Sequence, residues 1–236
     1  MSSLPGGYGF TLHTTFVVAL PEGLLWLPDS KTLVASDLHL EKGSAFAAKG
    51  SLLPPFDTSE TLNRLDIVMM RLKPDLLIAL GDSFHDVAAD ERLHPTDKSR
   101  LLEISLRQQT IWVEGNHDPE VPDWLAGERR AAFCHEALLF THAPTGQVAG
   151  EVAGHLHPCA RVAGASGRTI RRRCFVSDGS CLIMPAFGAF TGGLNIRDTA
   201  FDGLFTAPPV ALIMGGTARA PTKISAVDVR KLEMGH

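Results

Sequence analysis

The chain has 236 residues, of which 44% are hydrophobic and 20% are charged, and its formal net charge is −4. This length and composition allow one sizeable hydrophobic core, which excludes a disordered chain, a collagen-like repeat and a small disulfide scaffold. We therefore expect a single domain over residues 1–236. Since the charges nearly balance, the protein as a whole does not attract nucleic acid, and a polyanion would have to be bound locally.

The sequence gives no sign of export or of a membrane span. The first ten residues lack the basic and apolar segments of a signal peptide, and the longest apolar runs, residues 16–20 and 76–80, are too short to cross a bilayer. The chain has four cysteines, Cys134, Cys159, Cys174 and Cys181. They lack CxxC spacing, which favours reduced thiols. We expect a cytoplasmic protein without a membrane partner.

Short apolar runs predict five buried strands, at residues 32–35, 76–80, 110–113, 138–141 and 147–153. Between the first two, Asp57 and Glu60 have capping-box spacing, and apolar residues at helical spacing continue to Pro74, which ends the predicted helix. A second helix is predicted from about Thr96 to Leu106. Strands that alternate with helices indicate parallel pairing in the first half. The whole pattern predicts a mixed α/β sandwich with helices outside two sheets.

Polar residues follow each of these five strands directly. They are Asp37 and His39, then Asp82, then Asn116, His117 and Asp118, then His142, and finally His155 and His157. In open α/β sheets ligands bind where strands end and loops begin, so the five motifs can converge on one crevice.

The residue types in these motifs suit two divalent metals. Carboxylate, amide and imidazole groups are ligands for hard to borderline ions, and no thiolate is placed to favour a soft one. Asp-x-His and His-x-His would each put both side chains on one side of an extended segment. Two metals about 3.5–4 Å apart need a shared ligand. Asp82 is the candidate bridge, because a carboxylate has two oxygens.

In this order the motifs resemble those of the calcineurin-like metallophosphoesterase superfamily, over residues 33–158. The resemblance implies a four-layer αββα sandwich with two mixed β-sheets and two divalent metals, manganese first, with iron or zinc as alternatives. Carried over by position, one metal would be held by Asp37, His39 and His157, the other by Asn116, His142 and His155, and both by Asp82. The implied reaction is attack on phosphorus by a hydroxide that bridges the two metals.

His117 is not needed as a ligand and is therefore the candidate general acid, with Asp118 beside it as a further catalytic residue. The stretch Gly81-Asp82-Ser83-Phe84-His85 is similar to that of DNA repair nucleases of the Mre and SbcD type. This similarity favours phosphodiester substrates and adds His85 to the catalytic candidates. The alternative is that His85 only orients a ligand.

Residues 37–43, 52–57 and 185–195 resemble the bacterial ligase-associated metallophosphoesterases known as PdeM. That resemblance implies a DNA damage response endonuclease or phosphodiesterase, active in DNA repair, with a DNA ligase, a helicase and an exonuclease as partners. Four basic residues are candidates for substrate binding: Lys42, Arg161, Arg171 and Arg172. Arg171 and Arg172 belong to a run of arginines over residues 168–173 that could contact phosphates or simply flank a solvated hairpin. Lys42 and Arg161 are candidates because they are close in sequence to the predicted ligands.

Two other functions fit the same motifs. One is a phosphatase or pyrophosphatase that acts on a small nucleotide. The other is a binding scaffold in a repair complex, which is less favoured because scaffold members lose ligands and all seven candidate ligands are present here together with His117.

Overall fold

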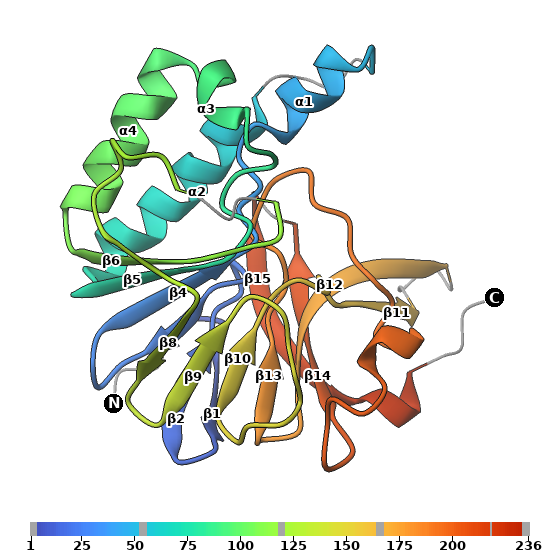
Figure 1. Cartoon of the computed structure of the whole chain (residues 1–236). Coiled ribbons are helices and arrows are strands. Elements are labelled where there is room, and N and C mark those ends of the chain that lie inside the picture. The colour runs from blue at the N-terminus through green and yellow to red at the C-terminus, as the bar shows by residue number, and fades with distance from the viewer. Residues whose placement is uncertain (1–3, 52–55, 118–120, 164–167, 218, 233–236) are drawn as a thin grey trace.

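The computed structural model describes the whole chain except residues 1–3, 52–55, 118–120, 164–167, 218 and 233–236. Within the described residues, two mixed β-sheets face each other and all the α-helices lie on the outer side of the first sheet, where α1 packs on α2 and α3 (Figure 1). The predicted α/β sandwich with two mixed sheets is therefore confirmed.

The first sheet follows chain order. Its described strands are β1 (Tyr8–Leu12), β2 (Thr15–Ala19), β3 (Leu25–Leu27), β4 (Thr32–Ser36), β5 (Leu76–Leu80), β6 (Gln109–Val113) and β7 (Glu128–Arg130). Strands β4 to β7 pair in parallel, as predicted, whereas β1 to β4 pair antiparallel. The three N-terminal strands were not predicted.

The second sheet has the order β15-β14-β12-β13-β10-β9-β8, and β11 pairs with β12. The bounds are β8 (Ala132–His135), β9 (Leu138–Thr141), β10 (Glu151–Ala153), β11 (Cys159–Ala163), β12 (Thr169–Ser177), β13 (Cys181–Ile183), β14 (Val210–Gly216) and β15 (Pro221–Asp228). The predicted strand at 147–153 is too long. Residues 147–150 form turns instead, and Gln147 N–H donates to the hydroxyl of Thr145.

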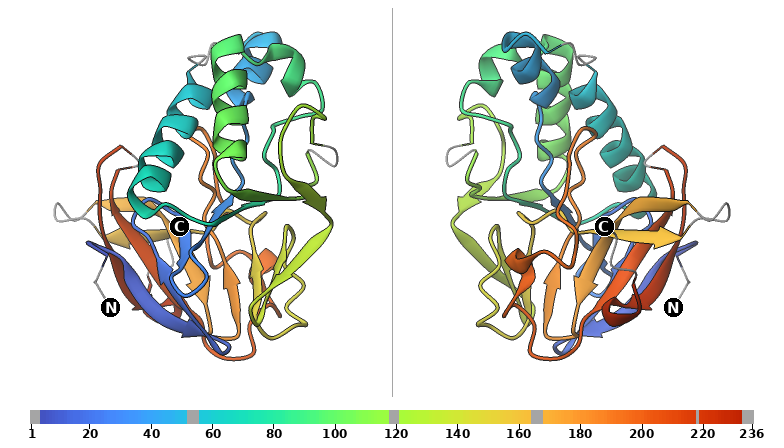
Figure 2. Two further views of the ribbon diagram at one scale, coloured as in Figure 1. Left: turned by 90° about the vertical axis from the view of Figure 1, so that its left-hand side faces the viewer. Right: turned by 90° about the vertical axis from the view of Figure 1, so that its right-hand side faces the viewer.

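The helices of the described chain are α1 (Lys42–Ala48), α2 (Asp57–Leu72), α3 (Ala89–Arg92) and α4 (Pro95–Leu106), and Figure 2 shows them on one side of the molecule. The outer face of the second sheet packs instead on the segment of the short 3₁₀ helix η1 (Thr199–Phe201). A second 3₁₀ turn, η2, spans Val229–Lys231. None of the described helices is long and apolar enough to cross a membrane.

The predicted capping box of α2 is wrong. Phe56 is the N-cap, and Asp57 is already helical. The Asp57 carboxylate accepts a 2.9 Å hydrogen bond from Gly43 N–H at the start of α1, and Glu60 pairs with Arg219. Both acids therefore bind partners far away in the sequence, which local spacing cannot indicate. The predicted end of the helix before Pro74 is confirmed.

Side chains that alternate along the central strands fill two core layers. In β4, Leu33 and Ala35 pack under the helices, whereas Val34 packs against the second sheet. In β5, Leu77 and Ile78 divide in the same way. Because these strands are buried on both faces, polar groups are confined to their ends.

Candidate metal centre

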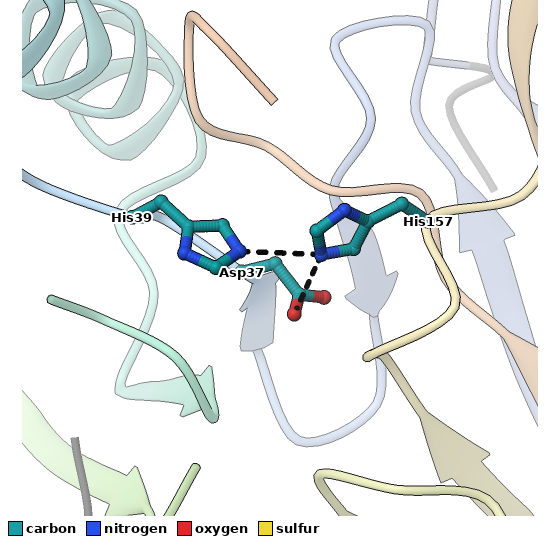
Figure 3. A group of neighbouring side chains, drawn as sticks. All are labelled: Asp37, His39 and His157. Atoms are coloured by element: carbon teal, nitrogen blue, oxygen red, sulfur yellow. Dashed lines mark hydrogen bonds and ion pairs between the residues drawn. The ribbon is translucent and has the colours of Figure 1, made fainter. Parts of the chain in front are cut away.

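The first group of candidate ligands lies where β4 ends. Asp37 and His39 follow the strand, and His157 reaches them from the segment after β10 (Figure 3). Their ligand atoms all lie within 4.8 Å of one another. Nε2 of His157 is 3.3 Å from Nε2 of His39 and 3.0 Å from Oδ1 of Asp37.

The second group consists of Asp82, His142 and His155, which follow β5, β9 and β10. Its ligand atoms also lie within 4.8 Å of one another. Nε2 of His142 is 3.2 Å from Nδ1 of His155 and 3.4 Å from Oδ1 of Asp82. The second group therefore draws ligands from both sheets.

Asp82 lies between the two groups. Its Oδ1 faces His142 at 3.4 Å, and its Oδ2 faces His39 of the first group at 3.8 Å. Each carboxylate oxygen is thus directed at a different group, which is the geometry that a bridging ligand needs.

The residues present fit two divalent cations. Ligand atoms that bind one ion at about 2.1 Å with a tetrahedral angle lie about 3.4 Å apart, close to the separations within each group. Two imidazole nitrogens that approach this closely need either a shared proton or a shared cation between them. Nitrogen and carboxylate oxygen donors without sulfur also suit hard to borderline metals.

The backbone at these ligands is left-handed, which corrects the expectation of extended Asp-x-His and His-x-His segments. The φ angles are +53° at Asp37, +44° at His39, +46° at Asp82, +67° at His155 and +47° at His157. Each such residue costs about 1–2 kcal/mol. As a result, His155 and His157 join different groups, and this strain at one place is typical of functional sites.

Two glycines make room for the ligands. A Cβ atom on Gly81, which has a φ of +71°, would overlap the ring of His142. A Cβ atom on Gly154 would overlap the carboxylate of Asp37 and the hydroxyl of Ser36 that donates to it. The glycines of the Gly-Asp and Gly-His motifs thus let ligand side chains lie directly on the backbone.

Burial and neighbouring charges shift the pKa values of three candidate ligands. Burial lowers the pKa of His39 to about 3, so its ring is neutral at neutral pH. Burial alone would raise the pKa of Asp82, but hydrogen bonds from His142 and from the backbone of His117 lower it well below its usual range. Burial opposes the charged form of His142, yet its hydrogen bond to Asp82 and the charge of Asp37 raise its pKa.

Of the predicted residues that follow β6, the structure shows only His117 in contact with a candidate ligand. His117 N–H donates to Oδ1 of Asp82 at 2.9 Å, and the His117 ring is half exposed with Nε2 3.9 Å from Oδ2 of Asp82. Asn116 is exposed, and its ligand role stays a prediction. Asp118 lies outside the described residues.

His85 lies beside this motif. Its ring stacks on that of His117 at a centroid distance of 5.5 Å and faces His39 at 5.7 Å. Burial, with the charges of Lys42 and His117, lowers the pKa of His85. The ring of Phe46 in α1 lies beside the His85 ring, with 5.9 Å between the ring centroids, and Phe46 is 38% exposed. The sequence did not single out Phe46, since a lone aromatic in a short helix carries no signal.

The predicted substrate-binding residues are divided between two places. Lys42 is half-buried in the first turn of α1, and burial lowers its pKa. Arg161 and Arg171 are directly opposite each other in the β11–β12 hairpin. Arg172 donates to the carbonyl of Gly216 at 2.6 Å, which gives it a structural partner. Substrate binding by these four residues stays a prediction.

Glu151 is a further residue that the sequence analysis missed. It is fully buried in β10, and its carboxylate accepts hydrogen bonds from the backbone N–H groups of Thr145 and Gly146. It therefore fixes the loop that follows His142. An acidic residue inside the apolar run Gly150–Gly154 was the available signal.

Comparison with known proteins identifies the family. Residues 30–174 match the model of the calcineurin-like phosphoesterase family. The chain belongs to this family. It is therefore a phosphoester hydrolase. Such enzymes typically bind two divalent metals, and the described residues contain two groups that could hold a metal ion.

A solved structure shares this fold. The chain is similar to nuclease MPE of Pseudomonas putida, with 24% identity, 88% of this chain and 96% of that chain covered, and a TM-score of 0.66. It also matches the phosphoesterase Yfce of E. coli at 17% identity, with 84% and 98% covered and a TM-score of 0.42. No curated protein sequence matches the chain.

Proposed function

We propose that this phosphoesterase is a two-metal phosphodiesterase that cleaves nucleic acid, with DNA as its substrate and manganese as its metal. The observation that carries the proposal is the stacked pair of His85 and His117 beside His39, at the edge of both ligand groups. The similar fold of a nuclease from Pseudomonas putida supports it. The likeness of residues 37–43 and 185–195 to ligase-associated enzymes supports a role in DNA repair.

Each residue has a defined task in this proposal. Asp37, His39 and His157 would hold one cation, His142 and His155 the other together with Asn116, and Asp82 both. When bound, the two cations supply charge for the phosphoryl oxygens and lower the pKa of a water that attacks phosphorus.

His117 serves the departing oxygen. Its ring is half exposed, so substrate can reach it, and its backbone is fixed by the hydrogen bond to Asp82. A diester releases an alkoxide, which needs a proton, and an imidazole in its protonated form can give one. His85 stacks against His117 and limits the directions in which its ring can point.

Helix α1 presents the features that favour a nucleic acid. Lys42 and Phe46 are four residues apart and so lie on one face of the helix. Lys42 can bind a phosphate, and the exposed ring of Phe46 beside His85 can stack on the base next to the cleaved bond. Arg161 and Arg171 of the β11–β12 hairpin can contact further phosphates.

The test is an assay of metal-reconstituted protein against a phosphomonoester, a bis-aryl phosphodiester, and single- and double-stranded DNA. We expect cleavage of the diester and of DNA, and none by Asp82→Ala. Rapid hydrolysis of a monoester or a nucleotide pyrophosphate without any DNA cleavage would replace this proposal with a small-nucleotide phosphatase. Metal binding without any hydrolysis would indicate a scaffold.

A further inference from the structure

The loop Pro185–Asn195 contacts both chain segments that carry the first ligand group. At one end, Phe187 N–H donates to the carbonyl of Ser36 and Gly188 N–H to the carbonyl of Asp37, at 2.8 and 3.1 Å. These bonds join the loop to the last residue of β4 and to the left-handed turn at Asp37. Figure 1 shows this orange loop, after β13, rising from the second sheet toward α2.

At its other end the same loop brackets His157. Leu194 N–H donates to the carbonyl of Leu156, and Cys159 N–H donates to the carbonyl of Leu194 at 2.8 Å. Gly193 lies so close to the His157 carbonyl that a Cβ atom would overlap it. The loop thus fixes the backbone on both sides of the first group. In the described chain it forms no hydrogen bond with Asp82, His142 or His155 of the second group.

Two arginines hold the loop in place. Arg173 donates to the carbonyls of Ala186 and Gly188, both at 2.9 Å. Arg64 of α2 donates to the carbonyl of Phe187 at 3.0 Å, and its guanidinium carbon lies 4.2 Å above the Phe187 ring. The two guanidinium groups therefore bind the carbonyls of three consecutive residues, 186–188. Two of these residues, Phe187 and Gly188, donate the N–H groups that reach Ser36 and Asp37.

Burying two cations here is costly, which indicates that their position matters. Burial, together with the charge of Arg173, lowers the pKa of Arg64 to about 10. Burial also lowers the pKa of Arg173. A guanidinium group holds five donors in a rigid plane, so it can bind two carbonyls that are spaced apart, whereas the three donors of an ammonium group all leave one atom.

We propose that Arg173 and Arg64 are positioning residues for the first metal position, which they stabilise through the loop Pro185–Asn195 without touching metal or substrate. Arg173 comes from the arginine run in which the sequence suggested phosphate contacts, but its donors face the protein interior. The inference rests on the proposed two-metal centre. We expect an effect on the first metal position only, because the loop contacts the backbone at Asp37 and His157 and forms no hydrogen bond with the second group.

The experiment measures Mn²⁺ affinity calorimetrically in two backgrounds, His155→Ala, which retains the first position, and His157→Ala, which retains the second. We expect Arg173→Met to weaken binding about 10- to 100-fold in the first background and less than about twofold in the second. Arg130→Met, which removes an exposed guanidinium group that pairs with Glu128 on the same strand, is the control and should change neither.

A rescue experiment separates positioning from a general loss of stability. Guanidinium chloride at millimolar concentration should restore the first position of Arg173→Ala, whereas Arg173→Lys should stay weak. If Arg173→Met does not fold, the Mn²⁺ affinity of Arg64→Met is measured in the same two backgrounds, since this variant removes one hydrogen bond to a loop carbonyl and the contact with the Phe187 ring.

Equal weakening of Mn²⁺ binding at both positions, or no weakening at either, would overturn this inference but not the proposed function. Wild-type protein that takes up no metal would overturn the proposed function as well.

Discussion

The backbone N–H of His117 donates a 2.9 Å hydrogen bond to Oδ1 of Asp82, so the candidate general acid is fixed to the candidate bridging ligand. Asp82 therefore has two tasks that substitutions can separate. Asparagine keeps an oxygen that can accept from His117 but loses the charge, whereas alanine loses both.

We expect Asp82→Asn and Asp82→Ala each to lose metal from both positions and to lower diester hydrolysis by more than about 100-fold, because losing a residue that merely supports a ligand already costs about 10- to 100-fold. In metal-free protein, Asp82→Ala should shift the NMR signal of the His117 backbone amide more than Asp82→Asn does, because only alanine removes the acceptor of its hydrogen bond. Elemental analysis and amide NMR measure the two effects. Full metal content in Asp82→Asn would contradict the bridging role.

The stacked pair of His85 and His117 leads to a second prediction. His85→Ala should reduce diester hydrolysis more than monoester hydrolysis, because only the diester keeps a second ester group that must be accommodated beside His117. His85→Phe keeps a ring against His117 but removes the ring nitrogens, and thus separates stacking from hydrogen bonding. The ratio of kcat/KM for the two substrates is the measurement. A wild-type ratio in His85→Ala would argue against this role.

Gly81 allows a third prediction with a matched control. Gly81 and Gly179 both have left-handed φ angles, +71° and +88°, but only at Gly81 would a Cβ atom meet another residue, the ring of His142. Gly179→Ala should cost about 1–2 kcal/mol of unfolding free energy from backbone strain. Gly81→Ala should cost about 1–3 kcal/mol more, because the ring must move.

Urea unfolding measures both glycine variants, and metal titration shows whether displacing His142 weakens the second position. Equal stability losses in the two variants would mean that the ring of His142 does not pack against Gly81.

The ligand motifs could be predicted from the sequence because each is local. A run such as Leu76–Leu80 that is buried on both faces must end before a charged group, so Asp82 at the strand end is visible as a pattern. Parallel pairing of β4 with β5 brings the strand ends that carry Asp37 and Asp82 side by side, and parallel pairing of β9 with β10 does the same for His142 and His155.

Other features depend on distant partners and could not be predicted. Asp57 looks like a helix cap but binds Gly43, and Arg173 looks like a phosphate ligand but binds a loop. The left-handed backbone at Asp37 also leaves no trace in the sequence, because residues that usually avoid it are held there by bonds from Gly188 and by the ligand contacts. Spacing along the chain reports neither kind of contact.

Phe46 distinguishes a nucleic acid substrate from a small phosphodiester. If its exposed ring stacks on a base, Phe46→Ala should raise KM for an oligonucleotide by the equivalent of about 1–3 kcal/mol, the contribution of one stacked base. KM for methyl p-nitrophenyl phosphate, which has no base, should change little. Tyr8 of the edge strand β1 has nearly the same exposure, 37% against 38%, so Tyr8→Ala is the matched control.

An oligonucleotide with an abasic position beside the cleaved bond should bind wild type and Phe46→Ala equally well. If Phe46→Ala instead binds both oligonucleotides as wild type does, Phe46 does not stack on a base.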